Sequence, residues 1–209
     1  MATAMLMEPA VIENGAVMPR EMFHRVYAEC EDYERVELIE GVVYMPSPIK
    51  IVGHAREQKL ALRWLVGYEE TRDGDVEAMG SGSVLLDAQN EPIPDAMLYY
   101  LRPDRFEDGY LNGAPELIFE VAYSSVSKDL HQKKRAYERN GVREYIVWRV
   151  RQGAIDWFQL RDGAYVQRTP DARGMIESEV FPGLLLNVGA MVVLNRKAVL
   201  GALATGQPL

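Results

Sequence analysis

Cysteine is nearly absent from this chain, and its scarcity excludes two common ways of building or equipping a small protein. Among the 209 residues there is one cysteine, Cys30, so no disulfide can form within the chain. A single cysteine also lacks the paired spacing that is typical of a zinc site. Such cysteine usage is typical of a reducing compartment, and we expect this protein in the cytoplasm.

Long hydrophobic runs are missing as well. Residues 1–15 contain neither a basic segment nor a long apolar stretch, so they do not have the pattern of a signal peptide. The longest apolar stretch near the other end, residues 191–206, is interrupted by Asn195, Arg196 and Lys197. It is too short and too charged to cross a bilayer, and we therefore expect no membrane segment.

Positive charge is in short supply. Lysine and arginine number 23 against 31 aspartates and glutamates, which gives a formal net charge of -8. This balance counts against a sequence-independent nucleic-acid binder, which needs a broadly basic surface. It does not exclude a nuclease, because acidic ligands that gather metal ions add to the negative count. One segment, residues 128–143, is locally basic. Such a basic face can contact backbone phosphates, but it can equally be an ordinary solvent-exposed helix face.

The chain does contain enough apolar material for a core. Hydrophobic residues make up 48% of it and charged residues 26%, which is ordinary for a folded domain. The length suits one domain. We expect residues 1–17 to form a loose N-terminal leader and residues 18–209 to form a single domain.

Periodicity predicts the order of the elements. Apolar spacing predicts helices at 19–30, 54–69, 128–140 and 188–203. Apolar runs predict strands at 76–79, 83–87, 95–101, 117–123 and 143–150, with a polar loop at 102–114. Hairpins are expected over 35–45, around Glu40-Gly41, and over 154–169. The order predicts an α/β (α+β) fold: a mixed sheet against helices, with an N-terminal hairpin and a C-terminal β-hairpin plus helix.

One carboxylate falls inside the most apolar strand pattern. Glu120 lies in LIFEVAY, residues 117–123, with Ile118 and Ala122 two positions away on either side. A buried carboxylate is unfavourable unless it is paired or binds a metal. A solvated strand face would relieve that cost, but apolar residues at both neighbouring positions of the same face argue against it. We therefore favour a functional role for Glu120.

A second carboxylate, Asp95, follows Pro94 at the start of another strand pattern. Alone, this dipeptide is typical of a turn. It gains weight as a partner for Glu120, because two carboxylates on neighbouring strands can hold Mg²⁺ or Mn²⁺, which prefer oxygen ligands. Such an ion polarises a phosphate and lowers the pKa of a bound water.

A helix supplies the third candidate group. Asp129, Lys133 and Tyr137 are spaced by four residues and share one face of the predicted helix. An ammonium near a phosphate can orient water or stabilise developing charge. An ordinary surface Asp–Lys pair has the same spacing. Lys134 shares a face with Leu130 and Tyr137 equally well, so periodicity leaves both lysines open.

With these residues in view, the chain resembles the Uma-type restriction-endonuclease-like family of the PD-(D/E)XK nuclease superfamily. The resemblance runs from about residue 35 to residue 183. It is carried by an ordered set of segments: VELIEGVVYMPSP, His54 at the head of a helix, PIPDAML, LIFEVAYSSVSKDLHQKKRAYERNGVREYIVW and EVFPGLLL. It implies a single domain with a restriction-endonuclease-like core.

The resemblance implies roles for the candidate residues. Asp95 and Glu120 would be the acidic metal ligands, together with the backbone carbonyl of Val121. The superfamily's common pattern has a lysine two residues after the second acid, where this chain has Ala122. The lysine moves to the next helix in a D-x-x-x-K-x-x-x-Y-x-x-x-G pattern, which favours Lys133 over Lys134 and is matched by Asp129, Lys133, Tyr137 and Gly141.

Two further positions recur in the family pattern. Glu40 would be a third acid near the metal, unless it is only a turn residue. His54 would be a nearby polar helper, unless it caps its helix or bonds a core neighbour. The chain departs from the family's Ser-Pro-Ser-Thr stretch after the second acid, because it has YSSV at 123–126 and one residue fewer before Asp129. The shape of that loop is therefore not implied by the resemblance.

We expect a Mg²⁺-dependent phosphodiesterase that acts on DNA, with Mn²⁺ as a substitute ion and Lys133 assisting the attack of water on phosphorus. One alternative is an inactive nuclease-fold module that binds protein or nucleic acid. Another is a hydrolase of RNA or a nucleotide. A homodimer is expected, because two-fold dimers are common and two sites cut both strands. The C-terminal helix and the aromatic hairpin (Trp157, Phe158 and Tyr165) are either contact surfaces or core.

Overall fold

The computed structural model describes residues 12–29, 35–46 and 50–206, and its centre is a six-stranded mixed sheet. From edge to edge the strands are β11 (Ala164–Arg168), β10 (Ala154–Arg161), β9 (Glu144–Arg149), β8 (Leu117–Ala122), β5 (Ala96–Tyr100) and β3 (Val76–Met79). β8 and β9 run parallel, and the other neighbouring pairs run antiparallel. A parallel pair needs a crossover connection, which the helix predicted after β8 supplies.

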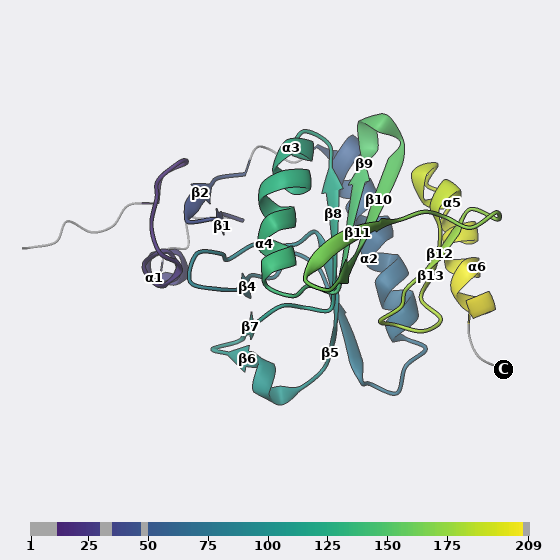
Figure 1. Cartoon of the computed structure of the whole chain (residues 1–209), viewed down its shortest axis with the longest axis horizontal. Helices are drawn as coiled ribbons and strands as arrows, with labels where there is room; N and C mark the ends of the chain where they lie inside the picture. The colour runs from purple at the N-terminus through teal and green to yellow at the C-terminus, as the bar shows by residue number, and fades with distance from the viewer. Residues whose placement is uncertain (1–11, 30–34, 47–49, 207–209) are drawn as a thin grey trace, which may run out of the picture.

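Helices cover both faces of this sheet (Figure 1). On one face lie α2 (Arg56–Glu69) and α6 (Arg196–Gly206). On the other lies one continuous helix, made of α3 (Val126–Lys128), the π-helical turn η3 (Asp129–Lys133) and α4 (Lys134–Arg139). Within the described residues, no helix has the length and apolar character that crossing a membrane requires.

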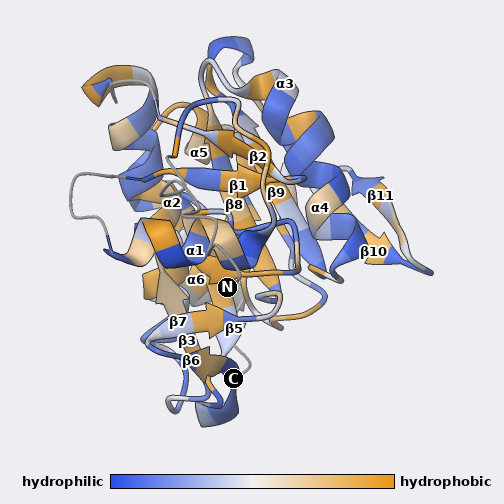
Figure 2. Cartoon of the chain, turned by 90° about the vertical axis from the view of Figure 1, so that its left-hand side faces the viewer, coloured by the Kyte–Doolittle hydropathy of each residue, from blue (hydrophilic) through white to orange (hydrophobic). Residues whose placement is uncertain are grey.

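The central strand β8 has no polar face. Phe119 and Val121 join the core under α2, whereas Ile118 and Ala122 join the core under α4. Burial of both faces explains why the sequence of β8 is an almost unbroken apolar run. Figure 2 shows hydrophobic strands β8 and β9 beside the α3–α4 helix, whose outer surface is largely hydrophilic.

The predicted N-terminal hairpin consists of β1 (Glu37–Ile39) and β2 (Val42–Tyr44). Its turn residues Glu40 and Gly41 have φ of 52° and 75°, the conformation of a tight two-residue hairpin turn. Backbone hydrogen bonds of 3.1 and 2.8 Å between Leu38 and Glu91 join the hairpin to the segment before β5. The hairpin lies on the α4 side of the sheet (Figure 1), and α1 (Arg20–Glu29) packs against it through Phe23.

Residues 12–17, predicted as part of a loose leader, pack on this hairpin. Ile12 is 1% exposed, and the Gly15 N–H donates a 2.8 Å hydrogen bond to the Val43 carbonyl. The rest of the predicted leader, residues 1–11, and Cys30 at the predicted end of the first helix lie outside the described residues.

The helix predicted over 188–203 is wrong as a single element. α5 (Val188–Val192) begins after Asn187, whose side chain accepts a 2.9 Å hydrogen bond from the Ala190 N–H. The chain then breaks at Leu194, whose φ of 57° is left-handed, and α6 follows. A left-handed residue cannot continue a right-handed helix, and periodicity alone did not reveal it.

The other differences involve short strands. The predicted loop 102–114 contains η2 (Pro103–Arg105), β6 (Phe106–Glu107) and β7 (Tyr110–Asn112), and the strand predicted over 83–87 is only β4 (Val84–Leu85), which pairs with β7. The hairpin of β12 (Met175–Glu177) and β13 (Leu185–Asn187) was not predicted. Strands of two or three residues give too little alternation to detect.

The two surfaces suggested for dimer contacts are largely core. Trp157 and Phe158 of the β10–β11 hairpin are 0% and 6% exposed. On α6, Val199 and Leu203 are buried in the core that includes α2. These four side chains therefore belong to the core and are not contact surfaces for a second copy.

Trp64 tests how far the α2 side of the core holds the domain together. Its ring packs edge-on against Phe119 and Trp157, and its indole N–H donates to the Leu185 carbonyl at 3.1 Å. We expect Trp64→Ala to lower the free energy of unfolding by about 3–5 kcal/mol in urea titrations, because it leaves a cavity. Val193→Ala, at a residue 72% exposed, should change it by less than about 0.5 kcal/mol. Equal effects would contradict this assignment of the core.

Candidate active site

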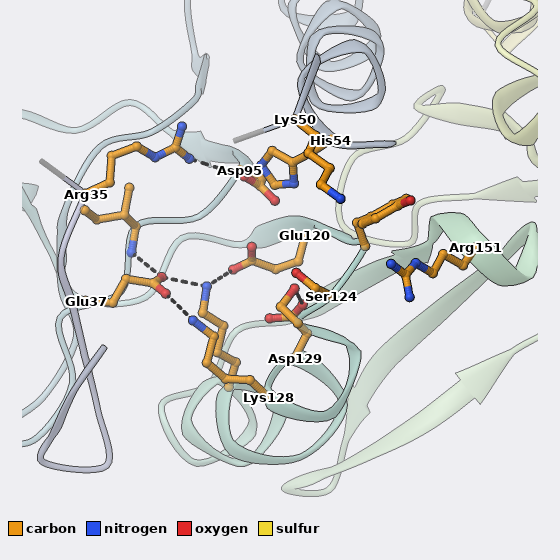
Figure 3. A pocket seen from close by; sticks show the side chains of 14 residues that line it. Arg35, Glu37, Lys50, His54, Asp95, Glu120, Ser124, Lys128, Asp129 and Arg151 are labelled. Atoms are coloured by element: carbon orange, nitrogen blue, oxygen red, sulfur yellow. Dashed lines mark hydrogen bonds and ion pairs between the residues drawn. The ribbon is translucent and has the colours of Figure 1, made fainter. Parts of the chain in front are cut away.

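A pocket of about 240 Å³ opens on the α4 side of the sheet. Hairpin β1–β2, the irregular turn η1 (Ile51–Ala55), β8 and helix α3–η3 contribute its walls. Four carboxylates line it, those of Glu37, Asp95, Glu120 and Asp129. Five basic side chains line it as well, those of Arg35, Lys50, Lys128, Lys133 and Arg151. In Figure 3, Glu37 and Arg151 lie at opposite ends of this pocket, with Glu120 between them.

The register of β5 and β8 brings Asp95 and Glu120 together. Ala96 pairs with Phe119 in this antiparallel ladder, so Asp95 and Glu120 occupy the next opposing positions and point to one face. At this end of the ladder a side chain takes the place of a backbone acceptor: Asp95 Oδ2 accepts a 2.8 Å hydrogen bond from the Val121 N–H. Asp95 is 5% exposed and Glu120 3% exposed. The two predicted acids therefore form one buried pair.

Glu120 is held from the helix side. Its Oε1 accepts hydrogen bonds from Lys133 Nζ at 2.8 Å and from the Tyr137 hydroxyl at 2.9 Å. Burial raises the pKa of Glu120 to about 8, and the carboxylates of Asp95, Asp129 and Glu37 add to the rise against the opposing effect of Lys133. Its surroundings therefore favour the protonated form more than those of an exposed carboxyl do.

Glu37, which sequence reasoning missed, shares the same lysine. Lys133 Nζ lies 2.6 Å from one Glu37 oxygen, and Lys128 Nζ lies 2.8 Å from the other. Burial alone would raise the pKa of Glu37, but the two ammonium groups outweigh it and lower that pKa to about 2. The available signal was the same as for Glu120: a carboxylate in a short apolar run, VELI at 36–39, which is buried throughout.

Glu40 does not reach the pocket, which corrects the expectation of an acid near the metal at that position. It occupies the tight turn of the hairpin, and its carboxylate makes hydrogen bonds of 3.1 and 2.7 Å with Arg135 on the outer side of α4. Three residues earlier, Glu37 is the hairpin acid that faces the pocket. The turn and the strand direct the two carboxylates to different places.

His54 lies beside the acid pair. Its Nε2 is 3.2 Å from Asp95 Oδ1 and its Nδ1 is 3.1 Å from the Val121 carbonyl oxygen. Both neighbours are acceptors, an arrangement that favours the doubly protonated ring, in which both nitrogens donate. The hydrogen bond to Asp95 raises the pKa of His54, although burial opposes the rise. Arg35 Nη2, at 3.4 Å, completes the surroundings of Asp95 Oδ1.

The helix places its predicted residues on the sheet side. Asp129 and Lys133 are 2% and 3% exposed, and the Ser125 hydroxyl donates a 2.5 Å hydrogen bond to Asp129. In the π-helical turn that begins at Asp129, the Asp129 carbonyl accepts a 3.0 Å hydrogen bond from the Tyr145 hydroxyl. Lys134 points elsewhere, with its Nζ 4.0 Å from the centre of the Phe158 ring. Of the two lysines, Lys133 is the one in the pocket.

The donor set suits a hard divalent cation in part. Asp95 and Glu120 offer two carboxylates on one face, and the Val121 carbonyl lies beside them, although His54 already uses one of its lone pairs. No group of three or more histidine, cysteine, aspartate or glutamate side chains within the described residues has the arrangement of a metal site. An ion here would therefore rest on two carboxylates, a carbonyl and water.

The raised pKa of Glu120 gives a testable pH dependence in the metal-free protein. Between its ordinary pKa of 4.5 and about 8, the folded state holds a proton that the unfolded state has lost. The stability of the wild type therefore falls as pH rises through this window, because the folded state binds more protons. Glu120→Gln removes that dependence.

Urea titrations from pH 5 to pH 8.5 in EDTA measure this effect. We expect the stability of Glu120→Gln relative to wild type to increase with pH and to level off above about 8. Glu21→Gln, at an exposed position on α1, should follow the wild type. A difference that grows toward acid would contradict the assignment.

Comparison with known proteins identifies a similar solved structure and the family of this chain. A crystal structure described as a "putative nuclease belonging to DUF820" from Anabaena variabilis has a similar fold, with a TM-score of 0.59 over 79% of this chain and 96% of that one. At 13% sequence identity this likeness shows the fold alone, and it confirms the predicted restriction-endonuclease-like core. No curated protein matches the chain significantly. Residues 20–189 match the Uma2 family, described as "Putative restriction endonuclease", and the chain therefore belongs to that family.

Proposed function

We propose that this protein is a metal-dependent endonuclease that hydrolyses phosphodiester bonds in DNA. The observation that carries the proposal is the cluster of Asp95, Glu120 and Lys133. Two carboxylates from opposing strand positions share one face, and a buried ammonium lies 2.8 Å from the second. Acids and a lysine in such proximity suit the binding of a cation, a water and a phosphate together.

Asp95, Glu120 and the Val121 carbonyl would hold the ion, Mg²⁺ with Mn²⁺ as a substitute. When bound, such an ion polarises the phosphate and lowers the pKa of a bound water. Oxygen donors of this kind are those that Mg²⁺ and Mn²⁺ prefer, with water completing the coordination. The family implies this chemistry, and the oxygen-rich donor set is consistent with it.

Lys133 would position the reacting groups. An ammonium has three N–H donors, and Glu37 and Glu120 accept two of them at 2.6 and 2.8 Å. Within the described residues no further carboxylate pairs with this ammonium, so the third donor would be available to the attacking water or a phosphate oxygen. Attack forms the new bond from the water oxygen to phosphorus, while the bond to the leaving oxygen breaks. The lysine's charge would stabilise the negative charge that develops on phosphorus oxygens.

The local charge removes the objection that the net charge of -8 raises. The pocket lining has five basic side chains and four carboxylates, so its formal charge is one positive unit before His54 is counted. A proton on Glu120 or on His54 makes it more positive. A local balance of this sign favours a polyanion at the pocket even though the whole chain is acidic.

A second candidate function is an inactive nuclease-fold module that binds nucleic acid or protein. Two observations favour it: the absence of a three-residue metal-binding group within the described residues, and the contacts of His54 with both Asp95 and the Val121 carbonyl. In that case the acid pair would serve structure and recognition. Metal binding separates the two candidates.

Calorimetric titration with Mn²⁺, and then Mg²⁺, tests the metal site. We expect the wild type to bind the ion and the double variant Asp95→Asn, Glu120→Gln to lose that binding, because both charges are removed at constant volume. Asp104→Asn, Glu107→Gln removes two exposed carboxylates and should bind as the wild type does. Equal binding by all three proteins, or by none, would favour the inactive module.

Cleavage of a supercoiled plasmid tests the lysine. We expect Lys133→Gln to lower the rate by about 100-fold or more, the usual size for loss of one group that stabilises transition-state charge. Lys134→Gln is the matched control on the next residue and should cleave within a few-fold of wild type. Thermal melting of both variants checks folding, since Lys133 is buried between two acids. Equal loss in both variants, or none in either, would contradict the assigned role.

A further inference from the structure

An aromatic ring stands at the end of the pocket away from Glu37. Tyr123 follows β8 directly and lies against η1, where Gly53 has a φ of +96°. A Cβ atom at Gly53 would come within 2.5 Å of two ring carbons of Tyr123. The backbone of η1 therefore fixes the position of this ring, and a larger residue at Gly53 would displace it.

Two cations lie over this ring. Lys50 Nζ is 5.4 Å from the ring centre, and Arg151 Cζ is 4.3 Å from it. Lys50 precedes η1, and Arg151 belongs to η4 (Val150–Gln152), which follows β9 and packs against η1. Tyr123 and Arg151 thus leave the carboxyl ends of the two parallel strands β8 and β9. Figure 3 shows Lys50 and Arg151 extending toward the same end of the pocket.

These two cations contact an aromatic ring, whereas the other basic side chains of the pocket pair with carboxylates. Lys128 is 2.8 Å from Glu37, Lys133 is bound by two carboxylates, and Arg35 is 3.4 Å from Asp95. Within the described residues, neither Lys50 nor Arg151 forms an ion pair. An aromatic face attracts a cation without cancelling its charge. The positive charge at this end therefore remains available to an anion.

We propose that Lys50 and Arg151, arranged by Tyr123, bind a backbone phosphate of the substrate nucleic acid that flanks the phosphate at Glu120. Both cations are exposed and line the same pocket as Asp95 and Glu120, so one strand can contact both places. The guanidinium group of arginine and the ammonium group of lysine are well suited to binding phosphates. The proposal rests on the proposed function, since it assumes that a nucleic acid enters this pocket.

Binding in EDTA tests this site without cleavage, so it is independent of whether the protein is an active nuclease. The probes are fluorescein-labelled DNA and RNA duplexes of one sequence, followed by anisotropy at several salt concentrations. We expect Lys50→Gln and Arg151→Gln each to weaken binding about tenfold near 0.1 M salt. Each should also reduce the slope of log K against log salt by about 0.9.

Three further variants sharpen the test. Tyr123→Phe keeps the ring and should bind like wild type, because the hydroxyl makes no hydrogen bond within the described residues. Tyr123→Leu removes the ring and should weaken binding. Arg173→Gln removes another exposed arginine, which pairs with Asp171 outside the pocket lining, and should leave both affinity and slope unchanged.

The outcomes are distinct. Loss on DNA and RNA alike identifies a phosphate contact and supports the proposal. A double variant Lys50→Gln, Arg151→Gln with the wild-type slope overturns it, as does a loss confined to one of the two nucleic acids. Absence of binding by the wild type overturns it too. A failure of cleavage with metal, in contrast, affects only the proposed function.

Discussion

The site depends on one buried ammonium that two carboxylates share. Lys133 Nζ lies between Glu37 and Glu120, at 2.6 and 2.8 Å, in a place where it is almost wholly shielded from water. A charge that is buried so deeply destabilises the fold unless groups of opposite charge pair with it. Glu37 also binds Lys128 and keeps its charge, so burial acts mainly on Glu120. The arrangement thus gives two chemically similar acids opposite pKa shifts.

Segments that lie far apart in the sequence converge at this cluster. Glu37 comes from the N-terminal hairpin, Asp95 from the end of one strand, Glu120 from the central strand, and Lys133 from the crossover helix. The parallel pair β8 and β9 requires that helix, and the helix can satisfy its buried lysine only by facing the sheet. The fold and the site therefore impose the same orientation on α3–α4.

Much of this arrangement could be predicted from the sequence where periodicity and burial act locally. Glu120 was detectable because a carboxylate with apolar residues on both sides is out of place in a buried strand, and Asp95 because it opens the neighbouring strand. Periodicity alone left Lys133 and Lys134 open, and the family pattern favoured Lys133. Packing gives the physical reason, since Lys134 lies over the Phe158 ring. Glu37 could not be placed, because its role depends on how a hairpin docks far along the chain. The break at Leu194 was likewise invisible, because the apolar pattern continues through it.

The docking of the N-terminal hairpin has a consequence for how the acid–lysine cluster assembles during folding. Two backbone hydrogen bonds at Leu38 and the ion pairs of Glu37 hold the hairpin to the rest of the domain, and these same ion pairs keep Lys133 in place. A chain whose central sheet had formed without the hairpin would hold the lysine against Glu120 alone. The complete set of ion pairs around Lys133 can therefore form only after the N-terminal hairpin has docked on the central part of the chain. The docking of the hairpin and the geometry of the acid–lysine cluster are thus coupled through one salt-bridged side chain.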